Sequence, residues 1–124
     1  MRDIIQKHMT IPFEYGLADC CQFVGECVEA VHGYNPAKWF DYESEKDADE
    51  LIDQYGNLET LVTAKLGLPV EDFCDGDIAL YEQTDGSQIL GVVDGDRVVL
   101  KAQRGIAIWQ IKDAKAVWRT RWRK

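Results

Sequence analysis

The sequence lacks several features, and each absence excludes a class of protein. No run of apolar residues approaches the ~18 residues that a membrane-spanning helix needs. The net charge of −8 is the opposite of the basic excess that a nucleic-acid-binding surface requires. The first residues lack the apolar core of a signal peptide, so we expect synthesis in a cytoplasm. The sequence therefore predicts neither a membrane span nor a nucleic-acid partner.

Metal-binding patterns are also missing. The four cysteines stand at positions 20, 21, 27 and 74, which gives no Cys-x-x-Cys pair of the kind that holds zinc. Only His8 and His32 could add further ligands. The adjacent Cys20 and Cys21 could be bridged only with strain, so the cysteines form no disulfide framework. We therefore expect no metal and no cofactor.

What the sequence does contain is a normal globular composition, with 46% hydrophobic and 29% charged residues. Apolar residues at helical spacing, bounded by capping residues, predict helices at 2–9, 20–32, 45–55 and 58–66. Turn signals and short apolar runs predict strands at 78–81, 89–93, 97–102, 106–111 and 116–122. We expect one α+β domain over 1–124, in which the helical region 1–68 packs on one face of a five-stranded antiparallel meander in 74–122.

The segment 12–33 delivers a cysteine to the first turn of a buried helix. Asp19 is a good N-cap, Gln22 can reach back to its amide, and Gly33 ends the helix. A thiol among the unpaired amides of the first turn favours the nucleophilic thiolate, so Cys20 is the cysteine placed for chemistry. The predicted inward face consists of Phe23, Val24, Cys27, Val28 and Val31.

Charge and aromatic residues are unevenly distributed. Residues 41–59 hold eight acids against Lys46 alone, which we interpret as a solvated helix face, and the aromatic loop 34–42 is interpreted as a lid over the core. The chain ends in Trp-Arg-Thr-Arg-Trp-Arg-Lys, which is either a last strand with a frayed end or a docking surface. Because Trp and Arg are enriched at interface hot spots, the candidate partner contacts are Trp118, Arg119, Arg121 and Trp122.

Four short motifs follow one another along the chain: Pro-Phe-Glu-Tyr-Gly at 12–16, Asp-Cys-Cys-Gln-Phe-Val at 19–24, Gly-Asp-Ile at 76–78 and Leu-Gly-Val at 90–92. Together they resemble motifs of the NlpC-type, papain-like cysteine peptidases that cut cell-wall peptides. Pro-Phe-Glu-Tyr-Gly at 12–16 is similar to the family's Pro-Tyr-x-Trp-Gly loop, and Asp-Cys-Cys-Gln-Phe-Val at 19–24 is similar to Asp-Cys-Ser-Gly-Phe-Val, whose cysteine is the nucleophile. Gly-Asp-Ile at 76–78 resembles Gly-Asp-Leu, and Leu-Gly-Val at 90–92 resembles the strand His-Val-Gly-Ile. Small phage-encoded relatives found among tail-tip genes share these landmarks and an aromatic-Arg end, here Val-Trp-Arg at 117–119.

The resemblance implies a papain-like, NlpC-like fold over about residues 11–119 and also shows what has been replaced. The family's base histidine corresponds to Ile89, the polar group that orients the base corresponds to Lys101, and the loop tyrosine corresponds to Phe13. A charged lysine cannot accept a proton from imidazole, and the members of such a triad act as a unit. We therefore expect Cys20 to lie next to Ile89 and Lys101 in a site with no imidazole, where the lysine charge would further favour the thiolate.

Two functions from different classes remain open, beside an unrelated cytosolic binding domain. The first is a non-catalytic, peptidase-like structural component of a bacteriophage tail tip or baseplate, located in the virion tail after synthesis in the bacterial host cytoplasm. Its partners would be tail proteins, with peptidoglycan as a further contact. The second is an active cysteine peptidase or amidase that cleaves peptidoglycan peptides with Cys20. At ~1.5 Å per residue His32 lies roughly 18 Å along the helix, so only His8 could be recruited as base.

Overall fold

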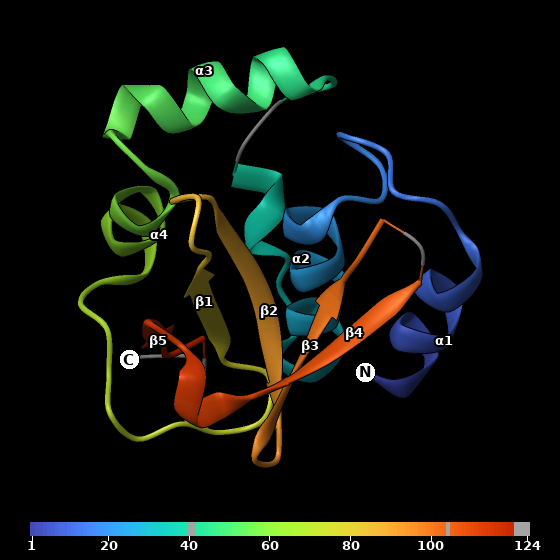
Figure 1. The fold of residues 1–124 in the computed structure, drawn as a ribbon. Coiled ribbons are helices and arrows are strands. Elements are labelled where there is room, and N and C mark those ends of the chain that lie inside the picture. The colour runs from blue at the N-terminus through green and yellow to red at the C-terminus, as the bar shows by residue number, and fades with distance from the viewer. Residues whose placement is uncertain (40–41, 104, 121–124) are drawn as a thin grey trace.

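A computed structural model describes residues 1–39, 42–103 and 105–120 of the chain. The helices occupy the first half and the strands the second, so the predicted α+β class is confirmed (Figure 1). The helices are α1 (Arg2–Thr10), α2 (Cys20–His32), the short 3-10 helix η1 (Pro36–Trp39), α3 (Glu45–Tyr55) and α4 (Leu58–Leu66). The strands are β1 (Ile78–Glu82), β2 (Gln88–Asp94), β3 (Arg97–Lys101), β4 (Ile106–Gln110) and β5 (Ala116–Trp118), and the 3-10 turn η2 (Ile111–Asp113) precedes β5.

The helix boundaries follow from their caps. The Asp19 carboxylate accepts a hydrogen bond from the Gln22 amide at 2.8 Å, and Ser44 and Asn57 cap α3 and α4 in the same way. Gly33 ends α2 in the left-handed conformation, with φ 86°. The predicted hydrogen bond from the Gln22 side chain back to the backbone N–H of Asp19 does not form. The side-chain amide of Gln22 instead donates to the Tyr42 hydroxyl at 3.5 Å.

The sheet is antiparallel throughout, in the order β4-β3-β2-β1-β5. The first four strands form the predicted meander, but β5 does not continue it. Instead β5 crosses over to pair with β1, with Ile78 opposite Trp118. The physical reason lies in β1, whose first four residues are all buried and whose second edge would otherwise stay unpaired.

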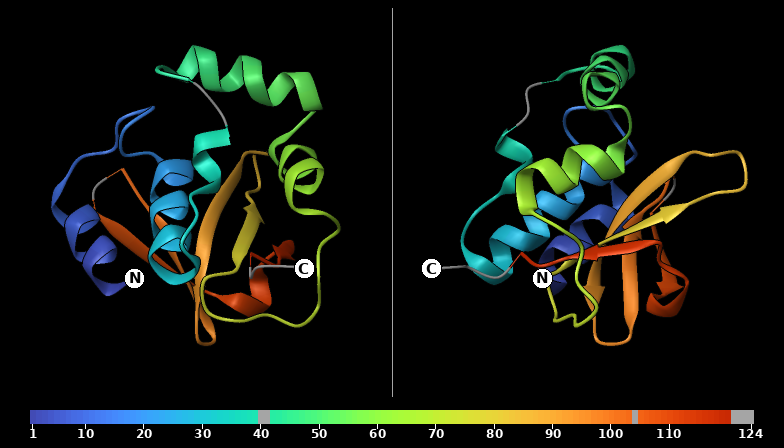
Figure 2. Two further views of the ribbon diagram at one scale, coloured as in Figure 1. Left: turned by 180° about the vertical axis from the view of Figure 1, so that it is seen from behind. Right: turned by 90° about the vertical axis from the view of Figure 1, so that its left-hand side faces the viewer.

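The main core lies between the helices and one face of the sheet. Figure 2 shows α2 and α4 on the same side of the strands, with η2 on the other side. Phe23, Cys27 and Val28 of α2 are fully buried against this face. The prediction that Val31 points inward is wrong: its side chain is 40% exposed and lies beside Gly76 in the loop before β1, outside the core between α2 and the sheet.

Trp118 is part of the core and does not form a docking surface. Its side chain is fully buried, and its indole Nε1 donates to Thr63 Oγ1 at 3.1 Å. The prediction of a partner contact at Trp118 is therefore wrong, because burial in this packing leaves no indole surface for a partner. Arg119 forms an ion pair with Asp72, in which the single nitrogen Nη2 donates to both carboxylate oxygens at 3.0 and 3.1 Å. The candidate contacts Arg121 and Trp122 lie outside the described residues.

Within the described ranges, every helix is too short or too polar to cross a membrane, in line with the sequence.

Replacing Trp118 by Ala is expected to lower the free energy of unfolding by about 3–5 kcal/mol, because a large buried side chain leaves a cavity that the core cannot fill. Urea denaturation followed by circular dichroism measures the change. Ile108→Ala on β4 is the matched control, since this apolar side chain is 55% exposed and a surface change stays within about 0.5 kcal/mol. Equal effects of the two substitutions would contradict the placement of Trp118.

Candidate functional site

The candidate site is organised by the buried carboxylate of Asp19. One oxygen accepts from the Gln22 amide and from the Tyr42 hydroxyl, each at 2.8 Å, and the other accepts from the Gly16 amide at 2.9 Å. Gly16 has φ 86°, and a Cβ there would lie 2.8 Å from the Tyr42 carbonyl oxygen, so only glycine fits. Asp19 thus ties the loop before α2, the first turn of α2 and the loop after η1 together.

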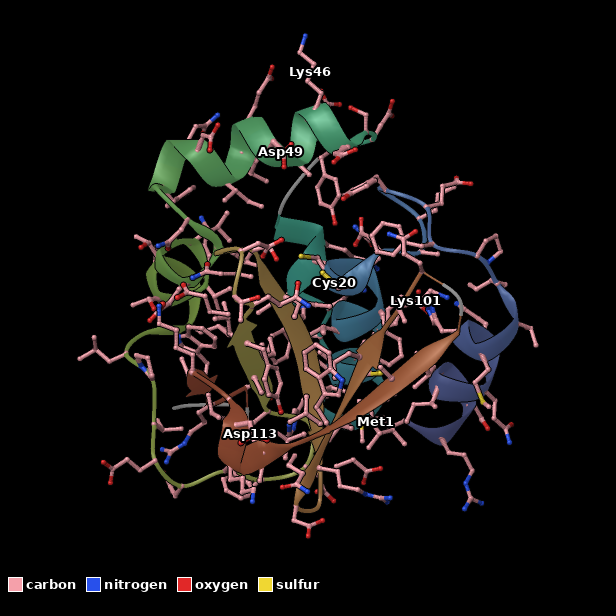
Figure 3. The ribbon with its side chains drawn as sticks, in the orientation of Figure 1. Met1, Cys20, Lys46, Asp49, Lys101 and Asp113 are labelled. Carbon is pink, nitrogen blue, oxygen red and sulfur yellow. The ribbon has the colours of Figure 1, made fainter. Side chains whose placement is uncertain are left out.

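Cys20 is the first residue of α2 and lies beneath α3 (Figure 3). Its pKa is lowered, mainly because the Cys21 thiol donates a hydrogen bond to it, with help from the backbone N–H of Leu90. Burial and the negative charge of Asp19 oppose this effect. The pKa of Cys21 is raised well above its ordinary value, first because its thiol donates a hydrogen bond to Cys20 and second because the thiol is buried. Of the two adjacent thiols, Cys20 is therefore the more acidic.

Both cysteines line a cleft of about 490 Å³. Its walls are mostly aliphatic and come from α2, α3, α4 and the β1–β2 hairpin, including Val24, Leu51, Ile52, Leu58, Leu61 and Leu90. Phe13 and Tyr15 also line the cleft, and their rings pack edge to face at 5.0 Å. Burial raises the pKa of Tyr15, and the nearby charges of Glu45, Cys20 and Asp49 raise it further. The cleft is therefore apolar in its walls and negatively charged near the thiols.

Ile89 does not face Cys20, and the expectation that the two are neighbours is wrong. Side chains alternate between the two faces of a strand, so consecutive residues of β2 point in opposite directions. Leu90 belongs to the core cluster beneath α2, whereas Ile89 packs with Tyr81 and Trp109 on the far face. The strand side chain on the cysteine's side of the sheet is thus Leu90, which is equally unable to accept a proton.

Lys101 also has a different role from the predicted one. Its side chain is buried, and its ammonium donates to the carbonyl oxygens of His8 and Ile11, so it caps the C-terminal end of α1. Burial lowers its pKa. In Figure 3 the Lys101 side chain lies beside α1. The predicted thiolate stabilisation by Lys101 is not supported, because the ammonium is committed to these carbonyls.

Neither histidine can serve Cys20 as a base. The His8 ring is buried edge-on against Phe23 at 5.0 Å, and its Nε2 lies 3.2 Å from Glu26 Oε1. Glu26 follows Cys20 by six residues, or roughly 9 Å along the helix. His32 lies in the last turn of α2, beside Gly76. Both histidines of the chain are among the described residues, and no imidazole there hydrogen-bonds to the Cys20 thiol.

Sequence reasoning misses three contributors to the site. Tyr42 falls in the segment interpreted as a lid, and its hydrogen bond to Asp19 joins segments too far apart for a local pattern to reveal. Leu90 is missed because the resemblance assigns the base position to Ile89, whereas the β2 side chain on the α2 side of the sheet is that of the next residue, Leu90. Cys21 carries a visible signal, since it forms a doublet with Cys20 directly after the helix cap. Among the described residues there is no group of three side chains that could hold a metal ion.

The fold and site define an α+β protein with a cysteine at the start of a buried helix, at the edge of an apolar cleft. A protein-family model matches residues 1–120, and the chain belongs to that family, which is described as a domain of unknown function (DUF6950). Comparison with curated proteins finds no match.

The pH dependence of Cys20 alkylation tests the thiol pair. In a Cys74→Ser background, which removes the exposed thiol, we expect Cys20 to react with iodoacetamide as a group whose pKa lies below its ordinary value. Cys21→Ala should raise that pKa, because the thiolate loses its hydrogen-bond donor. Mass spectrometry assigns the modified residue, and Cys27, whose pKa burial raises to about 12, should stay unmodified. An unchanged profile in Cys21→Ala would exclude this role of the pair.

Proposed function

We propose that this protein is a non-catalytic, peptidase-like component of a bacteriophage tail tip or baseplate, which acts by binding. The observation that carries the proposal is the Cys20 thiol, which lines a cleft and has no general base beside it among the described residues. Papain-like hydrolysis needs a group that takes the thiol proton and later gives a proton to the leaving amine. The groups around Cys20 cannot do both.

The groups beside Cys20 are poor proton carriers for separate reasons. Both carboxylate oxygens of Asp19 already accept hydrogen bonds, from Gly16, Gln22 and Tyr42. The Cys21 thiol and the Tyr42 hydroxyl have raised pKa values, so both hold their protons near neutral pH and are poor acceptors. The Tyr42 proton is already donated to Asp19. Leu90 has no ionisable group. A thiolate at Cys20 can react with an electrophile, but none of these neighbours completes the acyl transfer.

The tail assignment rests on the resemblance of the motifs at 12–16, 19–24, 76–78 and 90–92 to tail-associated relatives of the NlpC-type peptidases. The same reasoning assigns the protein to the virion tail, with tail proteins as partners and peptidoglycan as a further contact. The features suited to such partners are the cleft and α3, none of whose residues is buried and whose first turn carries Glu45 and Asp47. An acidic exposed helix suits a basic partner surface, which it would orient during association. Arg121 and Trp122 remain proposed contacts.

Incubation of the purified protein with peptidoglycan tests the absence of hydrolysis. We expect no new amine termini above the level of Cys20→Ala, because no group completes proton transfer. An active NlpC-type peptidase under the same conditions is the positive control. Turnover by the unmodified protein that disappears in Cys20→Ala would reject the proposal and establish the hydrolase.

Assembly of phage particles that carry variants of this protein tests the tail role. Charge reversal at the exposed α3 positions Glu50 and Asp53 should reduce incorporation of the protein into tails, whereas Cys20→Ala should assemble normally. Normal tails without any incorporated protein would contradict a structural role.

A further inference from the structure

The two edges of the sheet differ in how they are protected. In the order β4-β3-β2-β1-β5, the outer strands are β4 and β5. β5 has three residues, and its Val117 carbonyl oxygen accepts from the backbone N–H of Val70 at 2.8 Å, so the loop after α4 covers this edge. β4 has five residues, Ile-Ala-Ile-Trp-Gln, with no charge, proline or bulge. Because edge strands are usually protected by one of these devices, β4 is the unprotected edge.

The hydrogen bonds at the two ends of β4 show which of its backbone groups point outward. Residues of an antiparallel strand turn their N–H and C=O groups alternately to one side and to the other. Gly105 and Ile111 bond to the residues that flank β3, at 3.0 and 3.3 Å, so the odd-numbered positions face β3. The backbone groups of Ile106, Ile108 and Gln110 therefore point away from the sheet.

These outward groups form a row of free donors and acceptors. Among the described residues, the backbone groups of Ile106 and Ile108 have no hydrogen-bond partner on this side. The Gln110 carbonyl oxygen accepts from the Tyr81 hydroxyl at 2.7 Å and has a second lone pair to offer. The Ile108 side chain is 55% exposed beside Ile5 of α1. An added strand uses such a row of backbone groups with apolar side chains around it.

We propose that β4 pairs with β4 of a second copy of this chain, antiparallel and about a two-fold axis at Ile108. Ile108 of each copy then exchanges both backbone hydrogen bonds with Ile108 of the other, and Ile106 does the same with Gln110. The two five-stranded sheets become one continuous sheet, and the contact is the same surface on both copies.

The composition of β4 fits its own copy. A two-fold axis would set any charge near Ile108 against a like charge, and β4 carries none. On the face of the sheet away from α2, Ala107 of one copy lies opposite Trp109 of the other, so the smallest side chain of the strand adjoins the largest. The acidic helix α3 lies at the top of Figure 1, away from β4, so the paired edge keeps these charges apart.

This inference goes beyond the proposed function and does not depend on it, because the cleft and α3 lie apart from β4. Loss of pairing would leave the peptidoglycan assay unchanged, so the two can fail separately. Pairing depends on protein concentration, so Ile108→Ala remains a surface control when unfolding is measured on dilute, monomeric protein.

Sedimentation equilibrium of the purified full chain tests the pairing. We expect a monomer–dimer equilibrium, and Ile108→Lys should raise the dissociation constant by more than about 100-fold, because like charges then face each other across the axis. Leu68→Lys is the matched control, since Leu68 is 78% exposed in the loop after α4, and it should dimerise like the unmodified protein. Circular dichroism checks that each variant is folded. A chain that stays monomeric at millimolar concentration, as when β4 pairs only with a different protein, would overturn the proposal, and so would a dimer that survives in folded Ile108→Lys.

Mixing two variants tests the position of the axis. Ile108→Lys and Ile108→Glu should each be monomeric, and an equal mixture of them should form a heterodimer, because opposite charges then meet at the axis. A mixture that stays monomeric would reject this register.

Amide hydrogen exchange, followed residue by residue by NMR, tests whether the strands themselves pair. In the dimer the amides at positions 106 and 108 should exchange slowly, and in Ile108→Lys they should exchange fast. The amides of Ala107 and Trp109 bond to β3 and should stay slow in both proteins. Fast exchange at positions 106 and 108 in a dimeric sample would show that the copies join elsewhere and would overturn the proposal.

Discussion

The carboxylate of Asp19 makes three hydrogen bonds from a position that is 2% exposed, and the geometry of the cleft depends on them. It caps α2, fixes the loop at Gly16 and anchors Tyr42. Since a buried carboxylate must be fully hydrogen-bonded to be tolerated, the three segments are fixed as one unit. Cys20 follows Asp19 directly, so the hydrogen bonds of Asp19 also fix the position of the Cys20 thiol at the cleft.

The same arrangement explains why a cysteine in a nucleophile-like position need not catalyse. The Tyr42 hydroxyl donates its hydrogen bond to Asp19, Cys21 lowers the pKa of Cys20, and the aliphatic side chain of Leu90 lines the cleft. The pKa of Cys20 is thus lowered without a neighbouring base. A lowered pKa makes the thiol more acidic, whereas acyl transfer also needs groups that move protons during the reaction.

Local signals in the sequence predict the local structure well. The caps at Asp19, Ser44 and Asn57 fix three helix starts, and Asp94-Gly95 marks the β2–β3 hairpin. The failures concern contacts between distant segments. Which face Ile89 occupies depends on strand register, and the partner of Lys101 depends on where α1 docks. The burial of Trp118 follows from the crossing of β5 to β1, which no neighbouring residue signals.

The central claim is that Cys20 lacks a base because the strand side chain on its side of the sheet is Leu90. The most direct test compares Leu90→His with Ile89→His, with the thiolate followed by its ultraviolet absorbance against pH in a Cys74→Ser background. Leu90→His should lower the pKa of Cys20 further, because an imidazolium beside the thiolate stabilises it, and Ile89→His should leave that pKa unchanged. A lowered pKa in folded Ile89→His, with no effect in folded Leu90→His, would contradict the account.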